Sequence, residues 1–419
     1  MFEFGRDLRK LFDKARESED LGWIELIGAD LVEAEARREA VDAGRVSCAR
    51  PFDSWLRASG LWREHARRTG RRESLDRAAK CASDAARHTT APDETAAAAI
   101  ESGEIHLLRF DLFGGPAALN AALADAQSLT AERPATRAAA AALHARLCAR
   151  RARLSGSPAA LLDAAALLDA ALHGARALPA TAGDDLRMDR AALALEAGVA
   201  RRDGRLLDQA GRDLRALVET ASPDYRPLTR ARALALAGSG LMALAELADN
   251  AAARAQGREL FDAAADQFTP DHSPLDWVAV RLAAAGGDTP LLILAEAEAL
   301  SREPGLILGA LARERRLGAE AALAEAMGDV EALTTLEAII RRRLADAVRV
   351  EPLDWAADQI GMAHLGLARG RLTGLPPHAV GMMLAEAAET AREWGAPSLM
   401  QRAVLATPLN EGLGMSDQG

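Results

Sequence analysis

Arginine side chains at helical spacing are the residues of this sequence with the clearest capacity for chemistry. Arg146, Arg150 and Arg153 are four and three residues apart, so a helix would bring them to one face. Guanidinium groups in such a row can hold carboxylates or phosphates through paired hydrogen bonds. The same row can instead form ion pairs within and between helices on a solvated face. Both interpretations stay open at this stage.

Motifs that would place a nucleophile, a catalytic metal or a nucleotide phosphate are missing from the sequence. None of the three lysines follows a glycine, as a phosphate-binding P-loop requires. There is no Gly-x-Ser-x-Gly turn and no His-Glu-x-x-His zinc helix, and the eight histidines are scattered. We therefore expect a protein that is not an enzyme and uses no cofactor or metal. An enzyme built on a helical fold is the less favoured alternative.

Alanine dominates the composition. It fills 98 of the 419 positions, whereas aromatic residues make up 4% and only three of the 51 basic residues are lysines. Alanine is the best helix former and a poor strand former, so the composition predicts an all-α protein. A single core rarely grows beyond about 300 residues, which favours an elongated stack or several domains.

The formal net charge of −10 excludes a chain that is basic overall. Nucleic-acid binding depends on a basic surface and on aromatic residues that stack on bases, so we expect no nucleic-acid partner. The N-terminus lacks the apolar core of a signal peptide, and no membrane span is expected. Cys48, Cys81 and Cys148 are odd in number and widely separated. They indicate reduced thiols and a cytoplasmic location.

Glycine-containing breaks recur along the chain at an interval of about 43 residues. The glycines at these breaks are Gly70, Gly114, Gly156, Gly204, Gly287, Gly328 and Gly370. One interval is double, and its midpoint falls near residues 248–250, where we expect a turn without glycine. Helix-like sequence flanks each break, so residues 51–409 are predicted to form about eight antiparallel helix hairpins stacked in line.

The segments outside the repeats have separate predictions. Residues 1–50 are expected to form a helix pair, 4–17 and 20–44, that caps the stack of hairpins. The apolar stripe of Phe2, Phe4, Leu8 and Phe12 also allows a membrane-surface anchor as the less favoured interpretation. Residues 410–419 are predicted to be a disordered tail.

One stretch near the C-terminus carries a family resemblance. Residues 352–371 read PLDWAADQIGMAHLGLARGR, and Trp355, Gln359 and Gly370 match the first helix of certain bacterial tetratricopeptide repeats. A weaker echo occurs at residues 273–279. The chain therefore resembles a tetratricopeptide-repeat protein with lengthened repeats, and HEAT-type repeats of 40–47 residues are the alternative. The resemblance implies a right-handed superhelix, an α-solenoid, whose first helices line a concave groove for peptides or partner proteins.

Such a groove assigns positions to the candidate residues. If Gly70, Gly156 and Gly204 end their helices in the same way, groove-facing positions lie 2, 3, 6, 10 and 13 residues before each glycine. The predicted partner-binding residues among them are Arg57, Glu64, Arg67, Arg68, Arg146, Arg150, Arg153, Arg201 and Arg202. We expect a positive groove over the first four repeats.

The leading functional hypothesis is a scaffold or adaptor that binds a partner protein or an acidic peptide segment in the groove. The alternative is a regulatory sensor whose superhelix changes pitch when a peptide or small molecule binds. Solenoids can flex in this way because each repeat contacts only its neighbours. The sequence leaves the partner and the oligomeric state open.

Overall fold

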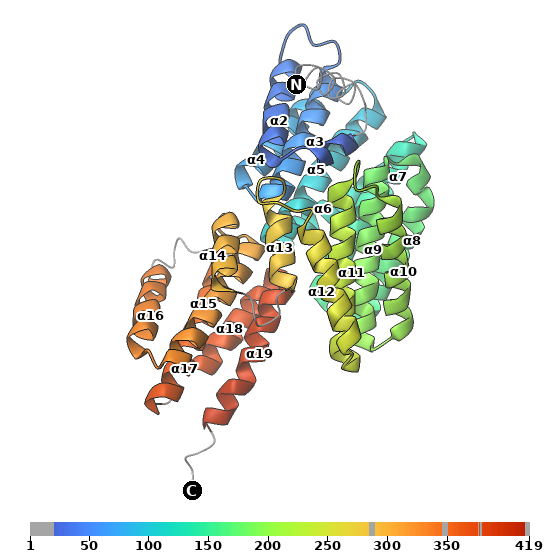
Figure 1. The fold of residues 1–419 in the computed structure, drawn as a ribbon. Coiled ribbons are helices and arrows are strands. Elements are labelled where there is room, and N and C mark those ends of the chain that lie inside the picture. The colour runs from blue at the N-terminus through green and yellow to red at the C-terminus, as the bar shows by residue number, and fades with distance from the viewer. Residues whose placement is uncertain (1–20, 285–289, 346–350, 376, 378, 415–419) are drawn as a thin grey trace, which may run out of the picture.

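The computed structural model describes residues 21–284, 290–345, 351–375, 377 and 379–414, together with the side chains of most of them. All regular structure in these ranges is helical, and they contain no strand. The predicted all-α class is therefore confirmed. Figure 1 shows three groups of helices, α2–α5 at the top, α7–α12 on the right and α14–α19 at the lower left, with α13 where they meet.

The helices follow one another with short connections. Their bounds are η1 (Leu21–Leu26), α2 (Ala29–Ala43), α3 (Pro51–Thr69), α4 (Arg72–Ala86), α5 (Pro92–Phe113), α6 (Pro116–Ser128), α7 (Pro134–Ser155), α8 (Pro158–Gly174), η2 (Ala175–Ala177), α9 (Ala180–Arg201), α10 (Gly204–Thr220), α11 (Pro227–Ala248), α12 (Ala251–Ala265), α13 (Pro274–Ala284), α14 (Leu291–Leu300), α15 (Ile307–Met327), α16 (Val330–Leu344), α17 (Pro352–Thr373), α18 (Val380–Glu393) and α19 (Pro397–Gly414).

Left-handed residues end many of these helices, as expected from the breaks in the sequence. Gly70, Gly156 and Gly328 have φ of 71°, 62° and 67°, which glycine adopts without the steric cost of a side chain. The turn predicted near residues 248–250 is also present. Asp249 takes φ of 46°, and the Asn250 side chain caps α12. Helix ends therefore follow the predicted interval at these four positions.

Two predicted breaks are displaced. At the end of α9 the left-handed residue is Arg202, with φ of 52°, and Gly204 is the first residue of α10. Gly370 lies inside α17, which ends one turn later before Gly374. A Cβ at Gly370 would lie 3.0 Å from the Leu375 carbonyl oxygen, so this glycine makes room for the chain that folds back over the helix. Gly287 lies outside the described residues.

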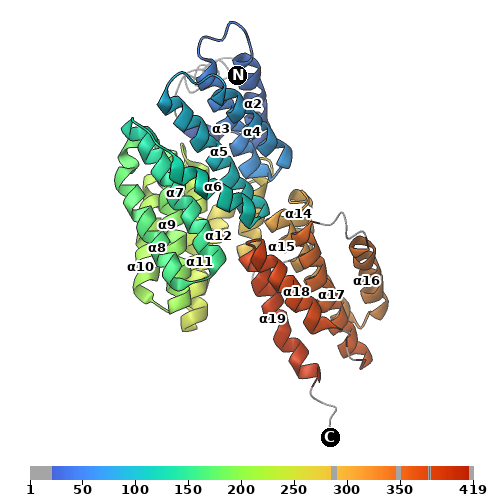
Figure 2. The ribbon, with the colours of Figure 1, turned by 180° about the vertical axis from the view of Figure 1, so that it is seen from behind.

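Consecutive helices pack side by side, and α3, α5, α7, α9 and α11 also contact one another in that order. The view from behind in Figure 2 shows the same succession through α6 to α12. Small residues allow close approach at these contacts. A Cβ on Gly238 of α11 would lie 3.1 Å from the carbonyl oxygen of Gly257 on α12. The small residues therefore have a packing role at these contacts.

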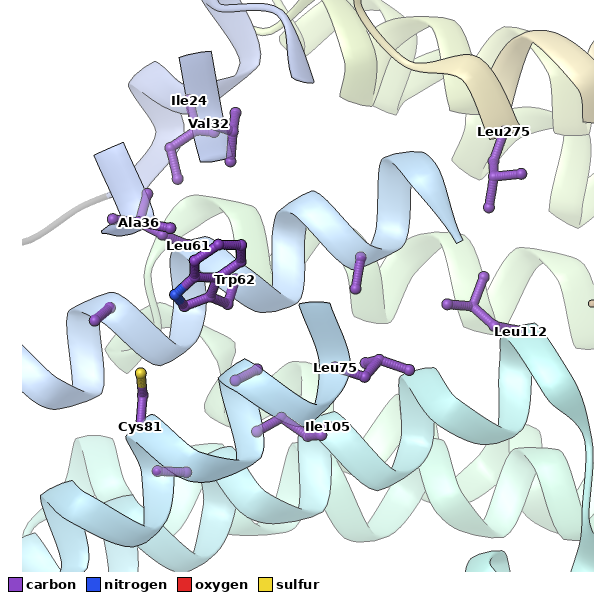
Figure 3. Packing of buried hydrophobic residues seen from close by; sticks show 14 of the residues in the cluster. Ile24, Val32, Ala36, Leu61, Trp62, Leu75, Cys81, Ile105, Leu112 and Leu275 are labelled. Atoms are coloured by element: carbon purple, nitrogen blue, oxygen red, sulfur yellow. The ribbon is translucent and has the colours of Figure 1, made fainter. Parts of the chain in front are cut away.

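The N-terminal segment differs from the predicted helix pair. Residues 4–17 lie outside the described residues. The described part of the second predicted helix, residues 21–44, forms η1 and α2 with Gly28 between them rather than one helix. Helix α2 packs along α3. Figure 3 shows the contact: Val32 and Ala36 of α2 face Leu61 and Trp62 of α3, and all four are buried.

Segments far apart in the sequence meet where the N-terminal and C-terminal helices come together. The turn after α3 lies on the start of α13 and on the α14–α15 connection. There, a Cβ on Gly70 would lie 3.0 Å from Leu275 and 3.1 Å from Leu306. Arg72 donates to the Pro304 carbonyl oxygen at 2.9 Å and pairs with Glu351 at 3.2 Å. The chain therefore curls back on itself.

A second such contact joins the α5–α6 turn to the α18–α19 turn. Gly114 has φ of 70° and ψ of −158°, a conformation that side chains disfavour. A Cβ at this position would lie 1.9 Å from the Trp394 carbonyl oxygen.

At the C-terminal end, α19 extends to Gly414, so part of the predicted tail, residues 410–414, is helical.

Replacing Gly114 by alanine should destabilise the protein by about 2 kcal/mol or more, because the new methyl group meets both backbone strain and the Trp394 carbonyl. The matched control is Gly204→Ala, which has no atom within 4 Å of the added carbon and should be neutral or slightly stabilising. Urea unfolding followed by circular dichroism measures both variants. Equal midpoints for the two would contradict the assigned role of Gly114.

Candidate interaction groove

The inner faces of five helices, α3, α5, α7, α9 and α11, line a concavity in the described part of the chain. A cavity of about 490 Å³ is lined by η1, α3, α5, α7, the η2–α9 region and α11. An adjoining hollow of about 270 Å³ continues along the same helices and shares Arg63, Arg67, Glu104, Arg146, Asp185 and Arg232 with it. We refer to the two together as the inner groove.

Helical spacing explains how each helix contributes a row of lining side chains. On α3, Leu56, Gly60, Arg63 and Arg67 are four, three and four residues apart and so share one face. The same spacing on α5 and α7 selects the residues that line the groove there. Because the helices lie side by side, these rows form one continuous surface.

The groove has an apolar part and a charged part. Towards the N-terminal ends of the helices its lining includes Leu56, Ile100, Ala139, Leu178 and Pro179. Further along the same helices the lining consists mainly of arginines and carboxylates. This division allows the groove to cover an apolar segment at one end and a charged one at the other.

The arginines in the charged part link neighbouring helices. Arg146 of α7 pairs with Glu104 of α5 at 2.6 Å and with Asp189 of α9 at 2.9 Å. Arg150 pairs with Asp111 at 2.8 Å and with Asp189 at 2.7 Å. Asp189 therefore holds two arginines of α7, and these side chains join α5, α7 and α9.

Further pairs extend this network on both sides. Arg63 donates to Glu101 at 2.9 and 3.1 Å, linking α3 to α5. Arg67 of α3 reaches Asp185 of α9 at 3.3 Å. On α11, Arg232 pairs with Asp276 of α13 at 2.6 Å. The guanidinium groups on the inner surface therefore form ion pairs that connect neighbouring helices.

The electrostatics follow from burial and pairing. Burial alone would raise the pKa of Asp189, but Arg150 and Arg146 hold it well below its usual range. Burial would likewise lower the pKa of the Arg150 guanidinium, but Asp111 and Asp189 raise it above its ordinary value. Both groups are therefore charged at neutral pH, as a paired buried network requires.

The expectation of a positive groove is wrong. The lining contains six guanidinium groups, those of Arg63, Arg67, Arg146, Arg150, Arg153 and Arg232. It also contains seven carboxylates, those of Glu25, Glu64, Glu101, Glu104, Asp111, Asp185 and Asp189. The acidic residues of α5 and α9 neutralise the arginines of α3 and α7.

Five of the nine predicted residues line the groove, namely Glu64, Arg67, Arg146, Arg150 and Arg153. Arg153 pairs with Glu196 at 2.9 Å.

The other four lie elsewhere. Arg68 is fully buried, lies outside the groove lining and donates to the Ile24 and Ile27 carbonyl oxygens. Arg57 is half-buried on α3 outside the lining, and Arg201 and Arg202 are exposed at the end of α9.

Three groove residues that the sequence analysis missed, Glu101, Glu104 and Asp189, lie at the same offsets from other helix ends. Counting 10 and 13 residues back from Gly114 gives Glu104 and Glu101, both of which line the groove. For α9 the counting should start at Arg202, the true left-handed residue, and not at Gly204. The same offset of 13 then gives Asp189. The spacing of these three residues is therefore visible in the sequence once the helix ends are placed correctly.

Other chemistry-bearing residues have structural partners. His65 is buried and its Nδ1 lies 2.8 Å from Ser74 Oγ, and burial lowers its pKa to about 4. Cys81 and Cys148 are buried among apolar side chains. Among the residues with described side chains, no cluster of three or more histidine, cysteine or acidic groups could hold a metal ion.

Comparison with protein-family models and with curated protein sequences finds no match for this chain.

Within the described ranges, α11 is the one helix long and apolar enough to cross a membrane. It packs against α9, α10 and α12, and the side chains of its Arg230 and Arg232 bond to groups on neighbouring elements.

Replacing Asp189 by asparagine should destabilise the protein by about 3 kcal/mol, because two buried arginines lose their shared counter-charge. The control is Glu196→Gln, which removes the charge of a carboxylate that is 44% exposed and should cost less than about 1 kcal/mol. Thermal unfolding of both variants measures the difference. A loss at Asp189 no larger than at Glu196 would mean that the network does not stabilise the fold.

Glu64 gives a pH-dependent test. Burial would raise its pKa, but Arg68, Arg232 and Arg67 lower it from 4.5 to about 2. The folded state binds this proton less readily than the unfolded state. The contribution of ionised Glu64 to the free energy of unfolding is therefore complete above pH 4.5 and is lost as the pH falls towards 2. The stability gap between the wild type and Glu64→Gln should therefore narrow over this range. Parallel pH profiles of the two unfolding midpoints would contradict the shift.

Proposed function

We propose that this chain is a non-enzymatic scaffold or adaptor that holds a partner protein in its inner groove. In this proposal the helices from α3 to α18 form eight hairpins of a right-handed, tetratricopeptide-like superhelix, with HEAT-like repeats as the alternative. The short connections, the recurring left-handed turns and the contacts among α3, α5, α7, α9 and α11 support that architecture. First helices that line a groove are the arrangement that such repeats use for binding.

The observation that carries the proposal is the combination of an apolar part and a charged part in one groove shared by five helices. A protein segment with apolar side chains at one end and charges at the other would match this surface. Because arginines and carboxylates are nearly balanced, a segment with charges of both signs fits better than a purely acidic peptide. An acidic peptide would have to displace carboxylates already bound to the arginines.

The same proposal places the protein in the cytoplasm without a cofactor or a nucleic-acid partner. The formal charge of −10 and the few aromatic residues support the last point. The cysteines of the described residues are unpaired, which suits a reducing compartment.

A regulatory sensor is the second candidate, and one observation favours it. The groove helix α5 contacts the C-terminal helices through Gly114 and Trp394, and α4, which packs on α3 and α5, contacts them through Arg72, Pro304 and Glu351. A ligand that changes the spacing of α3 and α5 would therefore alter the position of α15 to α19. Such coupling between two places needs a ligand that distinguishes the two arrangements.

The scaffold proposal predicts that a large cation in the apolar part of the groove abolishes partner capture. The variant is Ala139→Arg, since Ala139 lines the groove and is only partly buried. The control is Ala166→Arg on the exposed face of α8, outside the groove. Affinity purification from the native cell followed by mass spectrometry compares the captured proteins. Identical partner sets for wild type and both variants would refute binding in the groove.

A further inference from the structure

A short segment of the chain lies across the end of the inner groove. Residues 24–29, from η1 to the start of α2, lie between α3 on one side and α11 and the α12–α13 connection on the other. Ile24 and Glu25 belong to the groove lining. The segment thus contacts elements about 40 and more than 200 residues away in the sequence.

The surrounding residues bind the main chain of this segment. Fully buried Arg68 donates from two nitrogens to the carbonyl oxygens of Ile27 at 2.6 Å and Ile24 at 3.0 Å. His272 Nε2 lies 2.9 Å from the Glu25 carbonyl oxygen, and the Ala29 amide donates to the Asp271 carbonyl oxygen at 3.1 Å. Main-chain hydrogen bonds of this kind are how grooves bind peptides with little dependence on sequence.

One side chain of the segment is recognised specifically. Glu25 is 7% exposed, and its carboxylate accepts hydrogen bonds from the Thr229 amide at 2.8 Å and from the Thr229 hydroxyl. Thr229 is the third residue of α11, so the free amides and the dipole at this helix end favour a negative charge. Arg226 adds an ion pair at 3.6 Å. Ile24 and Ile27 flank this carboxylate and are buried.

We propose that the slot formed by Arg68, Arg226, Thr229 and His272 is a peptide-recognition site that residues 24–27 occupy in cis. Its ligand is a short segment in which a glutamate lies between large apolar residues, in the order apolar, Glu, any residue, apolar. This inference rests on the proposed scaffold function and names the chemistry of its partner. A partner segment of this type displaces residues 24–27 and then binds at the end of the inner groove.

The cis segment competes strongly because it is tethered. A short tether corresponds to an effective concentration of about 1 mM or more, so a free peptide binds the wild-type protein weakly. A substitution that weakens the binding of residues 24–27 but leaves the slot residues unchanged should therefore allow a free peptide to bind. Glu25→Lys does this, since a lysine would face Arg226 and the positive end of α11, whereas all slot residues remain.

The experiment uses the full chain and a fluorescent peptide with the sequence of residues Leu21–Ala29. Fluorescence anisotropy should show at least tenfold tighter binding to the Glu25→Lys protein than to wild type. A peptide with lysine in place of its glutamate should not bind. Glu73→Lys on the exposed face of α4 is the charge-matched control and should behave as wild type.

A milder variant, Glu25→Gln, covers the case in which Glu25→Lys does not fold, and circular dichroism establishes folding. A folded variant that binds the peptide no better than wild type would overturn the inference, because residues 24–27 would then be a permanent part of the core. The Ala139→Arg capture experiment remains separate. If that variant loses its partners but the peptide fails to bind, the slot is wrong and the scaffold proposal stands.

Discussion

The structure depends on the sharing of Asp189 between two arginines. Asp189 belongs to α9 and both arginines to α7, and the other partners of these arginines, Glu104 and Asp111, belong to α5. Asp189 and the two arginines are largely withdrawn from water. Such groups are tolerated only when every one has a partner, so the positions of α5, α7 and α9 are fixed relative to one another. The geometry of the inner groove follows, because its walls are the faces of these helices. Stability and the shape of the candidate binding surface therefore have the same cause.

Small residues give the second constraint. Where two glycines face each other, as between α11 and α12, the backbones approach more closely than any pair of side chains would permit. Close helices leave no room for a large core, and much of the buried surface is accordingly alanine. Arginines then reach across the remaining gaps, since a long side chain can bury its methylene groups and still place its charge on a neighbouring helix.

Much of the fold was predictable because helix ends have strong local causes. Glycine adopts left-handed conformations readily, so turns at Gly70, Gly156 and Gly328 could be located from the sequence. Arg202 shows the limit of this reasoning: a non-glycine residue takes the same conformation, and the nearby Gly204 drew the predicted turn two residues too far. The charges of the groove were mispredicted for a related reason. Acidic residues of α5 and α9 enter the surface only when the register of both helices is known.

The contact between Gly114 and Trp394 has a consequence for the history of the chain. A linear stack of hairpins can gain or lose a unit at little cost, because each unit touches only the next. Here the turn after α5 fits against the turn after α18, and the fit leaves no space for one methyl group. Duplication or deletion of a pair of helices between them would move the two turns out of alignment. The contact between these two turns therefore constrains how many helices can lie between α5 and α18.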